Sequence, residues 1–268
     1  MTDKFNKIYQ ESIQNPEKFW QNVSEDIFWF KKPTKILNKS KPPFYKWFED
    51  GVTNTCYNAI DTHIDKGKGD KIALIYDSPI TNKKAKFTYK ELREKISKFA
   101  GALDNQGIKK GDRVIIYMPM IPEAVIAMLA CGRIGAIHSV VFGGFASNEL
   151  ASRIDDSKAK ILITASCGFE PGRTVEYRPL VDGALKLAKH KVEKVIFFQR
   201  EGNEVKLNSP LEISWEESLI NAKDKDCVEI GANEFAYILY TSGTTGIPKG
   251  IVRDVGGHIV ALKWTMKN

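Results

Sequence analysis

Between residues 113 and 198 the chain alternates strand-like and helix-like stretches, and this alternation strongly constrains the fold. Short β-branched runs predict strands at Arg113–Tyr117, Ala136–Phe142, Lys160–Thr164 and Lys194–Phe198. Helical patterns lie between them at Pro122–Arg133, Asn148–Ile154 and Leu180–Lys189. Because parallel strands are joined by helical crossovers, we predict an α/β fold with a mostly parallel sheet and helices on both faces.

An irregular helical segment is expected to precede this α/β part. Residues 5–37 carry aromatic and aliphatic side chains at roughly helical spacing, interrupted by Pro16 and Pro33. We interpret these aromatics, which include Tyr9, Ile13, Phe19, Trp20 and Phe28, as packing residues rather than a stacking platform for a ligand. A further helix is expected around Thr55–Ile64, followed by strands at Lys71–Tyr76 and Ala85–Phe87.

Two capping boxes predict helix starts. Thr88 with Glu91 precedes an apolar stripe that Gly107 closes, and Ser214 with Glu217 begins a helix expected to run to about Ala222. In a capping box the two side chains satisfy backbone N–H groups that have no partner within the helix.

The stretch YTSGTTGIPKG, Tyr240 to Gly250, combines glycines, small hydroxyl residues and a single lysine. Glycines let backbone N–H groups turn toward a ligand, hydroxyls add donors, and Lys249 supplies a movable positive charge. These properties favour binding of a nucleotide's phosphates. A hairpin turn without a ligand is the alternative from composition alone.

A Walker loop is disfavoured at this position. Pro248 stands where its second glycine belongs, and Gly250 stands where a magnesium-binding Ser or Thr belongs. The loop follows an expected buried strand, Phe235–Tyr240, and precedes the β-branched run at 250–253, so we predict that it joins strand to strand.

YTSGTTGIPKG resembles the phosphate-binding signature of the AMP-forming acyl-CoA synthetases, within the adenylate-forming superfamily. GAIHSVVFGGFASNELASRIDDS, from Gly135 to Ser157, resembles the short-chain subgroup that uses acetate and propionate. GFEPGRTVEYRPLVDGAL and IVRDVGGHIVALKWTMKN are more similar to the propionyl-CoA type. The resemblance runs from Tyr9 to Asn268 and implies part of the large N-terminal domain of an adenylate-forming enzyme.

The resemblance implies that ATP and a short-chain carboxylate form an acyl-adenylate, which CoA then attacks to give the thioester. It implies that the ATP phosphates, with their Mg2+, are held by Thr241, Ser242, Gly243, Thr244, Thr245, Gly246 and Lys249. It also implies CoA contacts at Gly144 and Arg173, for which a tight turn and a solvated loop arginine are the alternatives. Glu170 departs from the family pattern, because an arginine stands there in similar enzymes.

The resemblance divides the chain into a helical preface, residues 1–65, and a partial AMP-binding α/β domain, residues 66–268. It places the catalytic residues, the adenine contacts, most of the acyl pocket and the adenylation lysine beyond residue 268, so Trp264 is not assigned to that pocket. We therefore expect the chain to be inactive alone. Alternatives are a non-catalytic binding module, or half of a split enzyme with a separately encoded remainder. A phosphotransferase is disfavoured by Pro248 and Gly250.

Composition and charge pattern argue against a nucleic-acid partner, a membrane-spanning segment and secretion. The net charge is +7, but the lysines are interspersed with acids, so no nucleic-acid site is predicted. The apolar run at 124–132 is too short to span a membrane, and no signal peptide is apparent. Acetate and propionate are not distinguished.

The cysteines and histidines suggest neither metal binding nor catalysis. The four cysteines, Cys56, Cys131, Cys167 and Cys227, lie far apart in sequence without a CxxC pair. We therefore predict no zinc site or disulfide framework, and reduced thiols in the cytoplasm. His138 is expected to be a hydrogen-bonded core histidine rather than a general base.

Overall fold

The computed structural model describes residues 3–241 and 248–268. Its helices are α1 Asp3–Gln14, α2 Pro16–Ser24, α3 Thr62–Asp65, α4 Tyr89–Asn105, α5 Pro122–Arg133, α6 Ser147–Ser157, α7 Arg178–Leu187, α8 Trp215–Ser218 and α9 Gly256–Lys267, with a π-helical turn at Tyr57–Asp61. Its strands are β1 Leu37–Asn38, β2 Lys46–Trp47, β3 Val52–Thr53, β4 Ile72–Ser78, β5 Lys83–Thr88, β6 Arg113–Met118, β7 Ile137–Phe142, β8 Ile161–Ala165, β9 Cys167–Glu170, β10 Arg173–Glu176, β11 Lys194–Phe198, β12 Glu212–Ser214, β13 Ile230–Gly231, β14 Phe235–Thr241 and β15 Lys249–Asp254.

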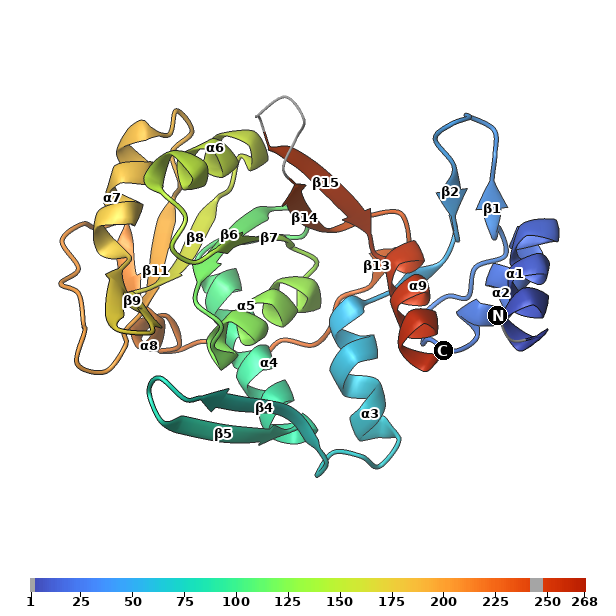
Figure 1. The fold of residues 1–268 in the computed structure, drawn as a ribbon, viewed down its shortest axis with the longest axis horizontal. Helices are drawn as coiled ribbons and strands as arrows, with labels where there is room; N and C mark the ends of the chain where they lie inside the picture. Colours follow the sequence, from blue (N-terminus) through green and yellow to red (C-terminus); the bar gives the residue numbers. More distant parts are fainter. Residues whose placement is uncertain (1–2, 242–247) are drawn as a thin grey trace.

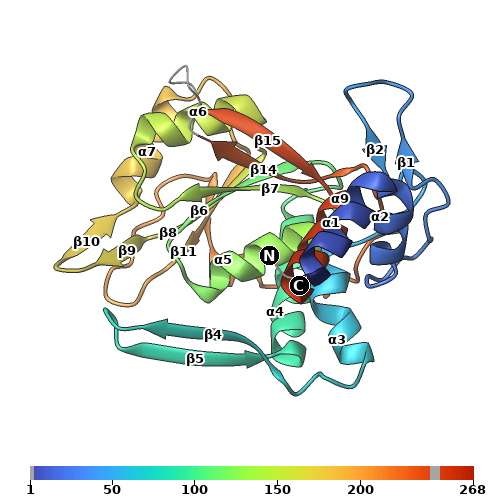
Figure 2. The same cartoon turned by 45° about the vertical axis from the view of Figure 1, so that its right-hand side comes forward.

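A central sheet in the order β12-β11-β8-β6-β7-β14-β15 organises the molecule (Figure 1). Every neighbouring pair in it is parallel except β14 and β15, which are antiparallel. Helices α4 and α5 lie on one face and α6 and α7 on the other (Figure 2). The predicted α/β fold, with a mostly parallel sheet and helices on both faces, is therefore confirmed.

The core forms where the sheet is covered on both faces. Strand β8 is buried at every position, and β6 is buried at every position after Arg113. These strands are continuous apolar runs because each face of a covered parallel sheet must meet a helix layer. The large buried side chains include Tyr117, Phe99, Phe197 and Leu150. This rigid centre fixes the strand ends that carry the candidate site.

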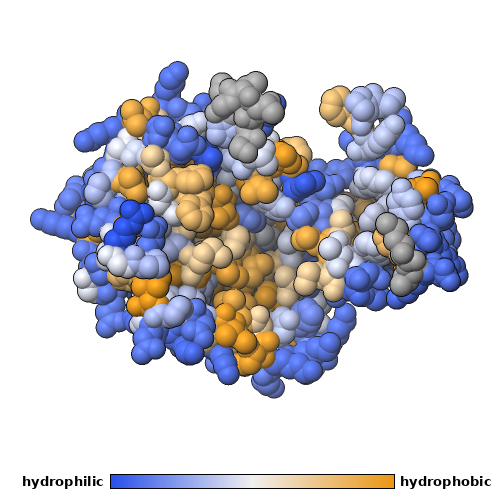
Figure 3. Space-filling view, viewed as in Figure 1, coloured by the Kyte–Doolittle hydropathy of each residue, from blue (hydrophilic) through white to orange (hydrophobic). Residues whose placement is uncertain are grey.

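Strand β14 is a strand as predicted, but the expectation that it is buried is wrong. Phe235 is 55% exposed and Leu239 is 48% exposed. Helices α4 to α7 cover the other half of the sheet (Figure 2), and β15 beyond β14 is exposed at every position from Lys249 to Arg253. Figure 3 shows apolar residues gathered in the middle of the face that is seen in Figure 1. Local hydrophobicity therefore predicted the strand, but not which part of the sheet is covered.

The N-terminal segment is helical as predicted, and its aromatics divide into two groups. Trp20 makes edge contacts with Trp47 and Trp264, and Phe19 also contacts Trp264, so this group packs the preface against α9. Tyr9 is 51% exposed and is only partly packed, because it stacks on Phe5 of the same helix with ring centroids 6.0 Å apart and lines an open pocket beside Trp264. Ile13 is likewise 53% exposed, whereas Phe28, although 37% exposed, packs against the rings of Phe30 and Tyr57 with ring centroids 5.0 and 4.6 Å away. Helical spacing cannot tell a packed face from an open one when the partner lies far away in sequence.

Both predicted capping boxes are present. The Thr88 hydroxyl accepts the Glu91 N–H at 3.2 Å, and the Ser214 hydroxyl accepts the Glu217 N–H at 3.0 Å. The second helix, α8, ends at Ser218 rather than near Ala222. Residues 222–229 run without helix or strand beside α4, where the Ser97 hydroxyl donates to the Lys225 carbonyl at 2.7 Å. Because this tertiary contact holds the segment in a non-helical conformation, α8 ends earlier than the sequence predicts.

Candidate functional site

Thr241 and Lys249, which flank the predicted phosphate loop, lie at the carboxyl ends of the parallel strands. Strand β14 pairs parallel to β7, so Thr241 and the end of β7 at Phe142 lie at the same edge. Thr241 pairs with Lys249 across the antiparallel β14–β15 ladder, which confirms that the loop joins strand to strand. Both residues are exposed. Of the other predicted phosphate contacts, Ser242, Gly243, Thr244, Thr245 and Gly246 lie outside the described residues.

Helix α6 anchors the base of this loop. The Tyr240 hydroxyl donates to Asp156 Oδ2 at 2.6 Å. Burial, together with this hydrogen bond, raises the pKa of Tyr240, so the phenol stays protonated as a donor. The Arg153 guanidinium lies 5.3 Å from the Tyr240 ring and 5.3 Å from the Phe145 ring. One side chain therefore joins the loop base to the Gly143–Gly144 turn.

The Gly143–Gly144 turn packs closely against Tyr117, Tyr177 and Met118. The Tyr117 hydroxyl donates to the Phe145 carbonyl at 2.7 Å and accepts the Gly144 N–H at 3.2 Å. A Cβ at Gly143 would overlap the Tyr177 hydroxyl and lie 2.8 Å from the Met118 carbonyl oxygen. Gly144 has a φ of 99°, a left-handed conformation that favours glycine. The tight strand-to-helix turn that was the alternative explanation for these glycines is therefore present, and it leaves the CoA contact of Gly144 a prediction.

Gly144 and Arg173, the two predicted CoA contacts, are linked through Glu170. A Cβ at Gly144 would meet Glu170 Oε1 at 3.9 Å as its nearest neighbour. Arg173 Nε donates to Glu170 Oε2 at 2.7 Å, across the β9–β10 hairpin. Glu170, which departs from the family pattern, thus neutralises the charge of Arg173. A pocket of about 330 Å³ lies here, lined by residues that include Gly143, Glu170 and Arg200.

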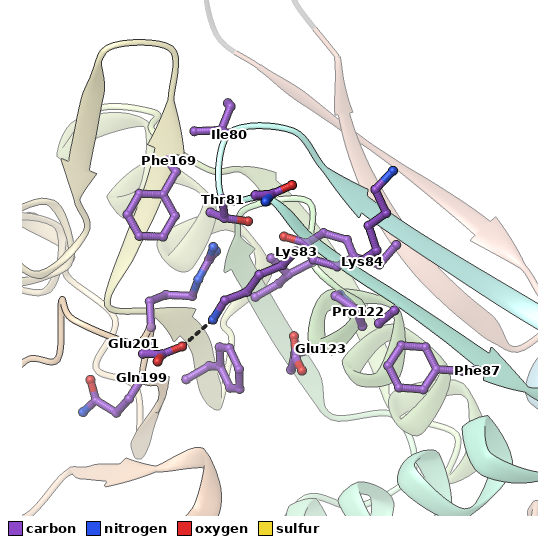
Figure 4. Close-up of a pocket in the computed structure, with 16 residues that line it drawn as sticks. Ile80, Thr81, Lys83, Lys84, Phe87, Pro122, Glu123, Phe169, Gln199 and Glu201 are labelled. Atoms are coloured by element: carbon purple, nitrogen blue, oxygen red, sulfur yellow. Dashed lines mark hydrogen bonds and ion pairs between the residues drawn. The ribbon is translucent and has the colours of Figure 1, made fainter.

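Arg200 is a cation of this region that the sequence analysis did not single out. Its guanidinium lies 4.7 Å from the Phe169 ring. It lines the pocket beside Gly143 and also a neighbouring pocket of about 830 Å³ under the β4–β5 hairpin (Figure 4). Across that larger pocket Lys83 reaches Glu201. The available signal was position, because Arg200 comes just after the carboxyl end of β11 and ligands of open α/β sheets bind at such ends.

Glu123, in the first turn of α5, lines the larger of these two pockets. Burial raises the pKa of its carboxyl group, which lines the larger pocket beside Pro122 and Arg200. The two pockets thus combine aromatic walls with both signs of charge, an arrangement suited to a ligand that carries a ring and anionic groups.

His138 lies within β7, and its expected hydrogen bond is not found at Nδ1. That nitrogen is buried and has no hydrogen-bond partner among the described residues. The imidazole stacks on Tyr237 with ring centroids 5.5 Å apart, and the Tyr237 hydroxyl is 3.1 Å from His258 Nε2. Burial lowers the pKa of His138 to about 4. Aromatic stacking rather than hydrogen bonding therefore holds this side chain.

The low pKa of His138 makes stability depend on pH. The unfolded imidazole takes up a proton near pH 6.5, whereas the folded one does so only near its pKa of about 4. The contribution is therefore complete above pH 6.5 and is lost as pH falls to 4 and below, by about 3 kcal/mol in total. Urea unfolding at pH 7 and pH 5 should show a smaller decrease for His138→Phe than for the parent chain. Equal decreases would contradict this assignment.

Two family models match the chain. The family described as "AMP-binding enzyme" matches residues 61–267, and "Acetyl-coenzyme A synthetase N-terminus" matches residues 5–59. The human protein "Acyl-CoA synthetase short-chain family member 3, mitochondrial" is 54% identical over 261 residues, covering 97% of this chain and 38% of that protein. The "Acetyl-coenzyme A synthetase" of Xylella fastidiosa is 42% identical over 268 residues, covering 97% of this chain and 41% of that protein.

A solved structure, "Acetoacetyl-CoA Synthetase from Streptomyces lividans", superposes with a TM-score of 0.86 at 25% identity, covering 96% of this chain and 39% of that one. The chain thus spans about two fifths of the length of the relatives it matches. Within the described ranges, every helix is too short or too polar to cross a membrane.

Proposed function

Because the chain belongs to the AMP-binding enzyme family, we propose that it is the N-terminal part of an ATP-dependent, AMP-forming short-chain carboxylate–CoA ligase. The reaction joins an acid, ATP and CoA to give acyl-CoA, AMP and pyrophosphate. The observation that carries the proposal is a strand-to-strand loop, based on Thr241 and Lys249, at the same sheet edge as the Gly143–Gly144 turn. The substrate class is taken from the names of the relatives.

In this proposal the loop from Thr241 to Gly246 and Lys249 binds the phosphates of ATP. A carboxylate is a poor acyl donor because oxide is a poor leaving group, and transfer to AMP replaces that oxide with a phosphate. The protein therefore has to position the substrates and stabilise charge on the phosphates. Exposed Lys249 can reach an incoming anion because no described ion pair holds it. Mg2+ enters with the nucleotide, and no residue of this chain is assigned as its ligand.

The remaining catalytic groups are proposed to lie outside residues 1–268, so the chain alone is expected to be inactive. The chain should therefore produce no AMP when incubated with acid, ATP and CoA. Robust thioester formation would disprove the inactivity. Release of ADP in place of AMP would instead support a phosphotransferase.

Gly144 and Arg173 are proposed to contact CoA, with Glu170 restraining the arginine. Glu170→Gln would release the Arg173 guanidinium for a phosphate, so CoA affinity should rise several-fold. Arg173→Gln should lower CoA affinity several-fold, and the decrease of affinity with added salt should be no steeper than in the parent chain. Isothermal titration of the chain with CoA at low salt measures both effects. Lys39→Gln, in the distant β1–β2 connection, is the charge-matched control for Arg173→Gln and should leave CoA affinity unchanged (Figure 1).

Weaker CoA binding for Glu170→Gln, or unchanged binding for Arg173→Gln, would contradict these CoA contacts.

The division into a preface at 1–65 and a partial domain at 66–268 is also proposed, since α3 ends at Asp65. A cytoplasmic location remains a prediction, whereas the human relative is described as mitochondrial. Competition between acetate and propionate in the completed enzyme would identify the acid.

A non-catalytic interaction module, or half of a split enzyme, is the second candidate. It is favoured by strand β15, whose residues Lys249 to Arg253 are exposed and whose outer edge has no strand partner among the described residues. An open edge of this kind offers backbone groups to another chain. Sequencing the DNA downstream distinguishes the cases. A continuous frame indicates one longer enzyme, and a separate frame indicates a split enzyme.

A further inference from the structure

Cys56 and Cys227, far apart in sequence, meet in the folded chain. Their sulfur atoms and a carboxylate oxygen of Asp61 all lie within 4.8 Å of one another. Cys56 is fully buried at the start of the helical stretch before α3, and Cys227 is partly exposed on the irregular segment 222–229. The spacing of the cysteines in the sequence does not indicate this proximity, because tertiary packing brings the two residues together.

A guanidinium already occupies the position where a metal ion would bind these donors. Arg133 Nη1 lies 2.8 Å from Asp61 Oδ2, 3.1 Å from Cys227 Sγ and 3.5 Å from Cys56 Sγ. Its Nη2 also donates to Asp61 Oδ1 at 3.1 Å. A metal cation would have to displace this buried positive charge. The arrangement therefore favours the chemistry of two neighbouring thiols over metal coordination.

We propose that Cys56 and Cys227 form a reversible disulfide by exchange with a low-molecular-weight disulfide such as oxidised glutathione. Cys227, the more accessible thiol, loses its proton to solvent and attacks one glutathione sulfur. The glutathione S–S bond breaks, and one glutathione thiolate leaves and takes up a proton. Cys56, deprotonated in turn, attacks the Cys227 sulfur of the mixed disulfide and releases the second glutathione. Two protein thiols are oxidised and one glutathione disulfide is reduced to two thiols.

The geometry supports each step. A disulfide needs the sulfurs, which already lie within 4.8 Å of each other, to close to about 2.05 Å. The Arg133 guanidinium stabilises a thiolate at either sulfur. The neighbouring Cys56 thiol, together with burial, raises the pKa of the Cys227 thiol, so the thiolate fraction and with it the rate of exchange increase with pH.

The bond would join the helical preface to the segment that follows α8. Because a disulfide restricts the unfolded chain, the oxidised protein should have a higher Tm than the reduced protein. Oxidation would thereby act on the stability of the whole preface without touching the phosphate loop.

The test uses the 268-residue chain in glutathione buffers of increasing oxidised fraction at pH 8.5. After acid quenching, free thiols are alkylated in denaturant and counted by intact mass spectrometry, and peptides are mapped without reduction. The reduced chain has four cysteines to label. In oxidising buffer we expect the loss of two labels and a disulfide-linked peptide pair that contains Cys56 and Cys227. The preference for this pair should disappear in guanidinium chloride.

Matched variants assign the bond. Cys131→Ser should still lose two labels, whereas Cys56→Ser and Cys227→Ser should lose none or carry only a glutathione adduct. Because the parent chain alone gives the decisive result, a variant that folds poorly does not obscure it. Full labelling of all four cysteines at every buffer ratio would overturn the proposal. A bond that includes Cys131 or Cys167 would overturn it as well.

Discussion

Replacing Asp61 with alanine should lower the free energy of unfolding by about 3–5 kcal/mol, because it leaves the charge of Arg133 buried without its partner. The two side chains are 9% and 4% exposed, and two hydrogen bonds of 2.8 and 3.1 Å join them. A guanidinium keeps its proton in proteins, so Arg133 cannot escape this cost by becoming neutral when Asp61 is removed. Urea unfolding at pH 7 measures the loss.

Two controls distinguish this explanation from general damage. The double variant Asp61→Ala/Arg133→Met should recover much of the stability, because it removes the buried charge together with its partner. Glu25→Ala breaks the Lys32–Glu25 pair, whose side chains are 69% and 60% exposed, and should change stability little. If the double variant were less stable than Asp61→Ala alone, the unpaired charge would not be the cause.

The sequence predicted those features that local pattern determines. Strands β6, β8 and β11 are short apolar runs, and the helices between them begin at Pro122 or carry an apolar stripe, so their types follow from composition and period. The parallel sheet then follows from crossover geometry. The position of Gly144 at a strand's carboxyl end was also predictable, because it depends on the same alternation.

Features that depend on contacts between distant residues were not predictable. Nothing local to Cys56 indicates Cys227, and nothing local to Phe235 or Leu239 indicates that their half of the sheet is uncovered. The Glu170–Arg173 pair depends on the register of the β9–β10 hairpin, which places Arg173 directly opposite Glu170. In each case the sequence gives the chemistry of a residue, and the tertiary fold decides its partner.

Gly101→Ala should destabilise the chain by about 3 kcal/mol, the upper end of what overpacking costs. Gly101 lies on the buried face of α4, where a Cβ would overlap the carbonyl oxygen of Lys223 and lie 2.8 Å from its carbon. The obstacle is backbone, and it cannot rotate away as a side chain would. The segment 222–229 is also tied to α4 by the Lys98 Nζ–Ala222 carbonyl hydrogen bond of 2.6 Å, so relieving the overlap disrupts that contact too.

Gly132→Ala is the matched control, because it is the same change inside the neighbouring helix α5. There the nearest atoms to an added Cβ lie 3.8 Å away, an ordinary packing distance, so alanine should stabilise by up to about 1 kcal/mol through its higher helix propensity. Opposite signs for the two variants in urea unfolding would show that close approach of segment 222–229, rather than helix propensity, requires Gly101. If Gly101→Ala were as stable as Gly132→Ala, the segment would be free to move away from α4, and Cys227 would then not be held beside Arg133.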